Sequence, residues 1–347
     1  MTTTILVWAL ATMSAAWMLT GVIRRYALRS MVDVPNHRSS HVVPTPRGGG
    51  LAIVLAMVGA WGLMPLLGLG VPGSWIALGA AVVVAGVGFV DDHNHVPAGV
   101  RLLGHVLAAV AIVWGLGGPP SIEFAGADLG AGLAGSFLAV LLVAWWINLT
   151  NFMDGIDGIA GAHVVAVCLG GAWVNAIGGA GLPLILGPVA LAAAASGFLF
   201  WNWPPARIFM GDVGSGFVGA MIAVLTLQAG QVNADLAWAW IILTGTFVVD
   251  ASMTLAVRIV RGEKLAQAHR NHTYQYLATR WGRHRDVTVL WTAVTACWLL
   301  PCALGVAWGR VDGWLATLIA FLPLVAGASW GQRAGGRARA RRADMVS

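Results

Sequence analysis

The chain has 347 residues, of which 58% are hydrophobic and only 10% are charged, and its formal net charge is +6. Because a soluble domain of this size carries about 25% charged residues, the composition excludes an ordinary soluble protein. Apolar residues come in blocks of about 17 to 25, each long enough to cross the bilayer core as a helix. The sequence therefore predicts an all-α, polytopic integral membrane protein.

Eleven such blocks follow one another along the chain. No stretch between them is long enough for a separate soluble domain, so 1–347 is expected to form a single transmembrane domain with a basic tail at 332–347. The first block is followed by Arg24 and Arg25 and is expected to stay as a helix rather than be cleaved as a signal. The predicted spans are 4–23, 49–69, 74–90, 102–118, 134–150, 158–178, 181–200, 213–231, 236–257, 288–308 and 313–331.

Basic residues predict the orientation of these spans. If the spans alternate in direction, one set of loops holds all the Lys and Arg residues except Arg310. The positive-inside rule places that set in the cytoplasm, with the N-terminus outside and the C-terminus inside. These loops are 24–48, 91–101, 149–157, 201–212, 258–287 and the tail after 331.

The high pI, about 10, is also typical of nucleic-acid-binding proteins. Basic loops that fix topology and contact anionic membrane lipids explain it better, so no nucleic-acid partner is expected. The three cysteines lie in apolar spans, which predicts neither a disulfide framework nor a zinc site.

Aspartates gather in three of the cytoplasmic loops. The third span ends in "GFVDDHNHVPAGVR" with Asp91 and Asp92, the fifth in "NFMDGIDG" with Asp154 and Asp157, and "MGDVGSG" places Asp212 before the eighth. Three loops distant in sequence thus offer carboxylates at a similar depth, as one shared site requires.

A single aspartate beside a helix end is often only a cap. That interpretation suits Asp157 and Asp212, each of which precedes a helix. It does not suit the adjacent Asp91 and Asp92, because a helix C-terminus disfavours anions and neighbouring carboxylates repel. We expect this pair to hold a cation or to act as an acid–base group.

Glycine and basic side chains complete an anion-binding pattern. "GDVGSG" at a helix start lets backbone N–H groups approach a phosphate. The loop "AQAHRNHTYQYL" carries His269, Arg270 and His272; a histidine pair at this spacing is often incidental, but the basic setting favours phosphate binding over metal binding. Arg101 is a further candidate phosphate contact. The loop "HRSSHVVPTPRGGG" contains further candidate contacts, namely Arg38, His41, Thr45 and Arg47.

Carboxylates for Mg²⁺, glycine-rich backbone and basic side chains suit phosphoryl transfer, in which positioning and charge neutralisation dominate. The predicted site lies where the cytoplasm meets the bilayer, within reach of a soluble nucleotide and of a lipid phosphate. An enzyme that joins a nucleotide-activated group to a membrane lipid has to work there.

Four motifs in this order carry a resemblance to a known family. "DDHNHVPAGVR", "NLTNFMDGIDGIAG", "FWNWPPARIFMGDVGSG" and "AHRNH" resemble those of the polyprenyl-phosphate N-acetylhexosamine-1-phosphate transferases, glycosyltransferase family 4, over about residues 35–274. The family includes the initiating enzymes of O-antigen and common-antigen synthesis and the muramoyl-pentapeptide phosphotransferase. The eleven-span count and the His-Arg-Asn-His sequence resemble the O-antigen branch, since the muramoyl branch has ten spans and three consecutive histidines.

The resemblance implies that a UDP-N-acetyl sugar and undecaprenyl phosphate react at the inner membrane to give a lipid-diphosphate-sugar and UMP. It implies Mg²⁺ or Mn²⁺ as cofactor, membrane lipids as neighbours and a homodimer. The implied catalytic residues are Asp91, Asp92, Asp154 and Asp212, with Asp91, Asp92 and Asp212 as metal ligands. The implied substrate-binding residues are Asn151, Asn202, Phe209, Gly211, Arg101, His269, Arg270 and His272.

Three other functions are weighed against this one. CDP-alcohol phosphatidyltransferases also have a DG-rich Mg²⁺ motif, but here no carboxylate follows Asp157 until Asp212. A transporter or flippase would use Asp250, an intramembrane carboxylate that could instead pair with Arg258 or Arg261. A non-catalytic scaffold would leave the clustered aspartates unexplained.

Overall fold

The computed structural model of the protein is almost entirely helical and describes all residues except 1, 34–42, 95, 131, 265–268 and 345–347. Its helices are α1 Thr2–Ser30, α2 Leu51–Leu63, α3 Ser74–His93, α4 Ala98–Gly115, α5 Gly132–Met153, α6 Ile159–Ile177, α7 Leu182–Asn202, α8 Asp212–Val232, α9 Ala234–Leu243, α10 Gly245–Val260, α11 Thr273–Trp281, α12 His284–Val294, α13 Leu300–Ala307 and α14 Gly313–Asp344. A 3₁₀ helix (Pro65–Leu67) follows α2, and a π-helix (Thr295–Leu299) joins α12 to α13. The strands are β1 Val32–Asp33, β2 Thr45–Pro46, β3 Glu123–Phe124 and β4 Ala127–Asp128.

The predicted all-α, membrane-spanning fold is confirmed, but the count of eleven spans is not. Within the described part of the chain, nine helices are long and apolar enough to cross a membrane, with α12 and α13 counted as one. A tenth arises if α9 and α10, which meet at an angle of 69°, form one broken span. The predicted span 49–69 is a shorter apolar helix, Leu51–Leu67, because the chain turns at Gly68 in a left-handed conformation.

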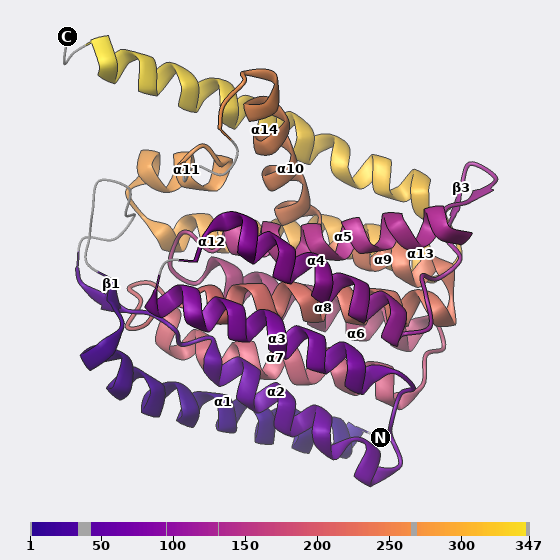
Figure 1. The fold of residues 1–347 in the computed structure, drawn as a ribbon. Coiled ribbons are helices and arrows are strands. Elements are labelled where there is room, and N and C mark those ends of the chain that lie inside the picture. Colours follow the sequence, from indigo (N-terminus) through magenta and orange to yellow (C-terminus); the bar gives the residue numbers. More distant parts are fainter. Residues whose placement is uncertain (1, 34–42, 95, 131, 265–268, 345–347) are drawn as a thin grey trace.

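Helix α8 is the centre of the bundle. In Figure 1, α1 to α8 run nearly side by side, and α8 lies among α3, α5, α7 and α9. The apolar stretch of α8 is entirely buried, whereas only 17% of the corresponding stretch of α1 is buried. Because Asp212 is the first residue of this central helix, it lies in the middle of one end of the bundle.

Glycines allow the close packing around α8. A side chain at Gly50 of the α2 entry would collide with the Gly214 backbone, and one at Gly219 would meet the carbonyl of Trp146 on α5. Close approach of this kind is the usual way in which helices pack within a membrane. It brings the ends of α2, α5 and α8 together at the end that carries Asp212.

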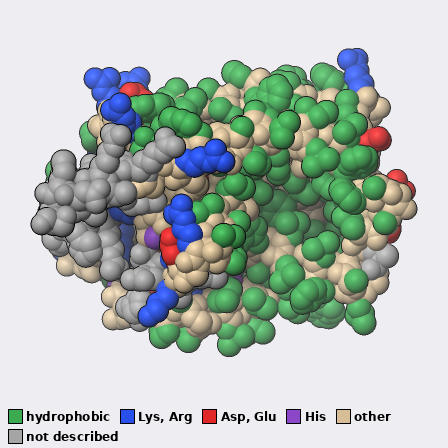
Figure 2. Space-filling view, turned by 90° about the horizontal axis from the view of Figure 1, so that it is seen from above, with side chains coloured by type: hydrophobic (Ala, Val, Ile, Leu, Met, Phe, Trp, Pro, Cys, Tyr) green, Lys and Arg blue, Asp and Glu red, His purple; other side chains and the backbone are tan. Residues whose placement is uncertain are grey.

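The outer surface is covered by hydrophobic side chains, as a lipid-facing protein requires. Figure 2 shows a broad hydrophobic area, with the charged side chains toward the two ends. Exposed examples include Trp114 on α4 and Leu133 on α5, whose burial in lipid removes apolar surface from water. Helix α1 begins and α14 ends at opposite ends of the molecule (Figure 1). Which end faces the cytoplasm stays a prediction.

A small extended layer lies over the Asp212 end of the bundle. Strands β1 and β2 pair antiparallel through Val32 with Pro46 and Asp33 with Thr45. The chain before α8 continues this layer: the Phe209 N–H donates to the Pro46 carbonyl at 2.8 Å, and the Gly49 N–H donates to the Phe209 carbonyl at 2.9 Å. These bonds hold the entries to α2 and α8 in a fixed relation.

Candidate active site

The N-terminus of α8 is capped by a carboxylate from another helix. Asp92, which is only 3% exposed at the end of α3, accepts the Asp212 N–H on one oxygen (3.0 Å) and the Val213 N–H on the other (3.1 Å). The preceding Gly211 has a φ of +76°, and a side chain there would collide with the Asp92 carboxylate. Glycine is therefore required where α3 meets the start of α8.

Arg101 joins the other two carboxylates. Its Nη1 atom lies 2.7 Å from Asp91 Oδ2 and 2.8 Å from Asp212 Oδ2, so one guanidinium connects α4 with α3 and α8. Asp91 Oδ1 also accepts the Val96 N–H at 2.7 Å, which fixes the turn between α3 and α4. Asp91 and Asp212 thus lie close enough to contact the same cation.

Helix α5 supplies an amide and a further carboxylate. The Nδ2 atom of Asn151 donates to Asp212 Oδ1 at 2.8 Å and to Ser215 Oγ at 3.0 Å. Asp154 follows directly after α5. Burial, together with the negative charges of Asp212, Asp92 and Asp157, raises the pKa of Asp154 well above its usual value. This corner of the site therefore carries an excess of negative charge.

The entry to α2 adds a basic side chain. Arg47 donates to the Asp92 carbonyl at 2.6 Å, and its Nε lies 3.9 Å from Asp92 Oδ1. This partly neutralises the buried carboxylate and ties the β2–α2 connection to α3. Arg38 and His41, expected in the same loop, lie outside the described residues.

Tyr274 attaches the histidine loop, residues 269–272, to the α5–α6 connection. The Tyr274 hydroxyl donates to the Phe152 carbonyl at 2.9 Å, two residues before Asp154. Burial, followed by the charges of Asp250 and Asp154, raises the pKa of Tyr274 well above its usual value, so the hydroxyl stays protonated and can donate. The rings of His269 and His272 stack with centroids 5.1 Å apart, and His272 stacks on Tyr274 at 5.6 Å. The structure thus brings the fourth motif to the loop that carries Asp154.

Asn202 and Phe209 occupy structural positions. The Asn202 amide is buried, accepts the Gly158 N–H at 3.0 Å and donates to the Ile208 carbonyl at 2.9 Å, so both of its ends hold backbone. Phe209 carries the backbone pairing with the β2–α2 segment described above. Their predicted contacts with a nucleotide stay predictions.

Asp157 does not cap α6, contrary to the simplest reading of the sequence. The residue before α6 is Gly158, in a left-handed conformation and without a side-chain cap. The Asp157 carboxylate instead accepts the Ala206 N–H at 3.1 Å and lies 3.3 Å from His284 Nδ1 on α12. Asp157 therefore fastens two loops together beside the site.

Comparison with known proteins identifies the family. The family model described as glycosyl transferase family 4 matches residues 74–230. The decaprenyl-phosphate N-acetylglucosaminephosphotransferase of Mycobacterium tuberculosis is 31% identical over 317 residues, which cover 80% of this chain and 77% of that protein. The chain belongs to glycosyl transferase family 4.

Two further relatives show the breadth of this family. A probable undecaprenyl-phosphate N-acetylglucosaminyl 1-phosphate transferase of Bacillus subtilis is 29% identical over 77% of this chain and 75% of its own length. The phospho-N-acetylmuramoyl-pentapeptide-transferase of Rhodococcus opacus is 31% identical over 66% of this chain and 74% of its own length. The match decides against a CDP-alcohol phosphatidyltransferase.

The site residues of this family 4 member fit a divalent cation bound together with substrate phosphates. In the described parts of the chain, no three carboxylate, histidine or cysteine side chains converge as a complete metal site. Mg²⁺, however, commonly takes only one or two protein carboxylates plus phosphate oxygens. Asp91 and Asp212 already share one cationic nitrogen of Arg101, so their oxygens suit this role. Asp92 suits it less, because both of its oxygens accept backbone N–H groups.

Sequence reasoning missed three residues that shape the site. No motif singles out Tyr274 or His284, and the sequence presents Asp250 only as an intramembrane carboxylate. Each acts across a long sequence separation, from 23 residues for Asp250 to 127 for His284. Periodicity and motif spacing carry no signal for such contacts.

Proposed function

We propose that the protein transfers N-acetylhexosamine 1-phosphate from a UDP-sugar to undecaprenyl phosphate, releasing UMP and leaving a lipid-diphosphate-sugar. The main observation behind this proposal is that Asp91, Asn151, Asp154 and Asp212 converge at one end of the helix bundle. Arg101 lies between two of these carboxylates. The names of the relatives support a sugar phosphate as the transferred group and a polyprenyl phosphate as its acceptor.

In this reaction a phosphate oxygen of the lipid attacks the sugar-linked phosphorus, and the bond from that phosphorus to the bridging oxygen of the diphosphate breaks. Transition-state charge then spreads over the phosphoryl oxygens, where fixed positive groups stabilise it. Arg101 and the histidine loop, with His269, Arg270 and His272, supply such groups. The first four N–H groups of α8 already bond Asp92 and the Gly211 carbonyl, so the phosphate contact expected there from the glycine motif is reduced to the pull of the helix dipole.

A bound Mg²⁺ or Mn²⁺ would neutralise the diphosphate and polarise its phosphorus. Asp212 and Asp91 are the residues placed to hold it, while Asn151 orients the Asp212 carboxylate through a 2.8 Å hydrogen bond. Asp154, at the end of α5 beside this group, is the carboxylate proposed to take the remaining proton of the lipid phosphate. Asp92 then acts mainly by holding α8.

The names of the relatives and the histidine motif guide the choice of donor sugar and pathway in this proposal. Two relatives are named for N-acetylglucosamine, so UDP-N-acetylglucosamine is the first donor to test. We assign the product to the first membrane step of O-antigen or another cell-surface polysaccharide, at the cytoplasmic face of the inner membrane. The His-Arg-Asn-His motif argues against a muramoyl-pentapeptide donor.

Purified protein tests this proposal with a panel of UDP-sugars. UMP should appear only when undecaprenyl phosphate and Mg²⁺ are both supplied, and a lipid-linked sugar should form in equal amount. No lipid-linked product with any UDP-N-acetyl sugar would contradict the proposal, and release without the lipid would indicate simple hydrolysis.

A further inference from the structure

Asp250 is a buried carboxylate in the bent α9–α10 pair. It lies on α10, one and a half turns beyond the 69° bend, and is only 3% exposed. Its expected partner Arg258 contacts the segment after α10, with Nε 2.9 Å from Glu263 Oε2 and Nη2 2.6 Å from the Lys264 carbonyl. An unpaired carboxylate at such a position is costly, so its actual partners identify its role.

Both oxygens of Asp250 bind the start of helix α11. Oδ1 accepts the Thr273 N–H at 2.9 Å, and Oδ2 accepts the Tyr274 N–H at 3.1 Å. These are the first two N–H groups of the helix, which lack partners within it. The negative charge also stabilises the positive end of the helix dipole. Asp250 therefore caps α11 as Asp92 caps α8.

The cap fixes the loop that precedes α11. His272 is buried, and its Nδ1 lies 3.8 Å from Asp250 Oδ1. On the other side, Gln332 of α14 donates to the Asn271 carbonyl and to Thr254 Oγ1, both at 2.7 Å. Residues 271–274 are thus held between α10 and α14, and Tyr274 carries that placement to the Phe152 carbonyl near Asp154.

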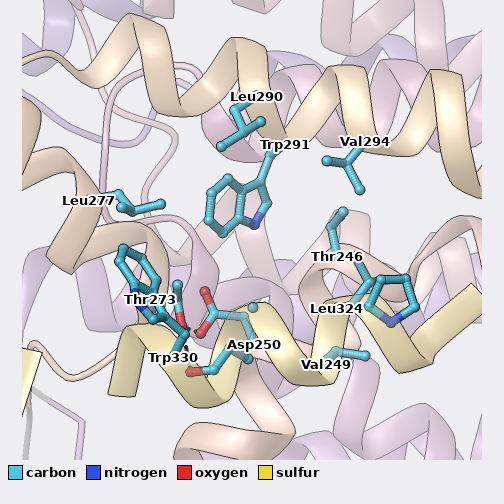
Figure 3. A pocket seen from close by; sticks show the side chains of 13 residues that line it. Thr246, Val249, Asp250, Thr273, Leu277, Leu290, Trp291, Val294, Leu324 and Trp330 are labelled. Carbon is cyan, nitrogen blue, oxygen red and sulfur yellow. Dashed lines mark hydrogen bonds between the residues drawn. The ribbon is translucent and has the colours of Figure 1, made fainter. Parts of the chain in front are cut away.

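A cavity of about 270 Å³ lies beside Asp250 and the start of α11. It lies among α10, α11, α12 and α14, and Figure 3 shows Asp250 and Thr273 together on one side of it. The opposite walls are apolar, from Leu290, Trp291 and Val294. Few polar groups there could replace the carboxylate as acceptor, so its removal leaves the helix N–H groups unsatisfied.

We propose that Asp250 is a positioning residue, which holds α11 and thereby sets His269, Arg270 and His272 against the Asp154 loop. Asp250 touches no substrate and acts through the histidine loop. The inference rests on the proposed function, in which that loop binds the diphosphate of the nucleotide sugar.

Hydrogen–deuterium exchange tests the structural half of this proposal without any activity. Asp250→Asn keeps one acceptor and Asp250→Ala keeps none, so exchange over 269–281 should rise in the order wild type, Asn, Ala. Asn175→Ala is the matched control, because Asn175 is equally buried and also makes two hydrogen bonds, to Trp240 and Leu184, near the other end of α6. The control should leave exchange over 269–281 unchanged. Unaltered exchange in both Asp250 variants would overturn the proposal.

Kinetics test the functional half. Asp250→Asn should lower kcat/KM for the UDP-sugar by roughly 10- to 100-fold, the usual loss when a supporting residue is removed. It should leave the KM for undecaprenyl phosphate within about twofold, whereas a general loss of folded protein would lower kcat alone. Adding His272→Ala should cost little beyond the larger single effect, since both changes act on one loop.

The outcomes separate this proposal from the proposed function. If wild type forms no lipid-linked sugar, the proposed function fails, while the exchange experiment still decides whether Asp250 holds α11. If wild type is active and the effects of Asp250→Asn and His272→Ala multiply fully, Asp250 does not act through the histidine loop.

Discussion

Asp91 and Asp92 are neighbours in sequence but differ in what their carboxylates contact. Asp92 gives both oxygens to the backbone of α8, whereas Asp91 shares Arg101 with Asp212. The pair was expected to act as one unit because adjacent carboxylates repel. In the fold their contacts differ: Asp92 caps a helix, and Asp91 shares a guanidinium with Asp212.

Replacing Asp92 should therefore affect stability and activity together. Asp92→Ala removes a two-bond cap and is expected to cost about 1–2 kcal/mol of stability, visible as a lower unfolding midpoint in detergent, with activity falling in parallel. Asp212→Asn should abolish most activity with little change of midpoint. An Asp92→Ala protein that keeps the wild-type midpoint would contradict the capping role.

Asp154 should give the metal-free protein a characteristic pH dependence. Burial and three neighbouring carboxylates raise its pKa in the folded state, so the folded protein binds its proton at pH values where the unfolded chain has released it. Stability then falls as pH rises from the ordinary aspartate pKa, 3.8, through the raised value. Thermal unfolding in EDTA across this range should show that fall, and Asp154→Asn should flatten it. A wild-type profile parallel to that of Asp154→Asn would contradict the raised pKa.

At the scale of elements, the start of α8 depends on Gly211. Ala at a φ of +76° and against the Asp92 carboxylate is expected to cost about 1–3 kcal/mol in backbone strain and to add a collision. Gly179 is a matched control, since it also has a φ of +76° but open space around its Cα. Gly211→Ala should lower the unfolding midpoint and the activity more than Gly179→Ala. Equal effects of the two changes would mean that crowding at the site is unimportant.

Hydropathy predicted most elements, because a lipid-facing helix must be apolar along its whole length. It did not predict that the chain breaks at Thr244, since α9 and α10 together read as one apolar block. Hydropathy also did not predict helix α11, because its start is fixed by Asp250 from 23 residues away. Motif order predicted that the aspartate loops meet, whereas the division of labour between Asp91 and Asp92 required three-dimensional contacts.

At the scale of the whole molecule, the predicted orientation places the Asp212 end in the cytoplasm. An impermeant maleimide added to intact cells should label Ala125→Cys in the β3–β4 turn and leave Arg283→Cys unlabelled until the membrane is opened. Both positions are exposed, and the native cysteines are first replaced. Labelling of Arg283→Cys in intact cells would reverse the orientation and move the site to the outer face.

The most direct measurement follows the sugar-linked phosphate of the donor from the nucleotide into the lipid. With UDP-N-acetylglucosamine labelled in the sugar-linked phosphate, wild type with undecaprenyl phosphate and Mg²⁺ should move the label into the lipid fraction, with one UMP released per label. Asp212→Asn should reduce this transfer by at least about 100-fold, since one lost transition-state contact costs that much. Label that stays with the nucleotide while sugar alone reaches the lipid, or transfer unaffected by Asp212→Asn, would contradict a sugar-1-phosphate transferase site at the start of α8.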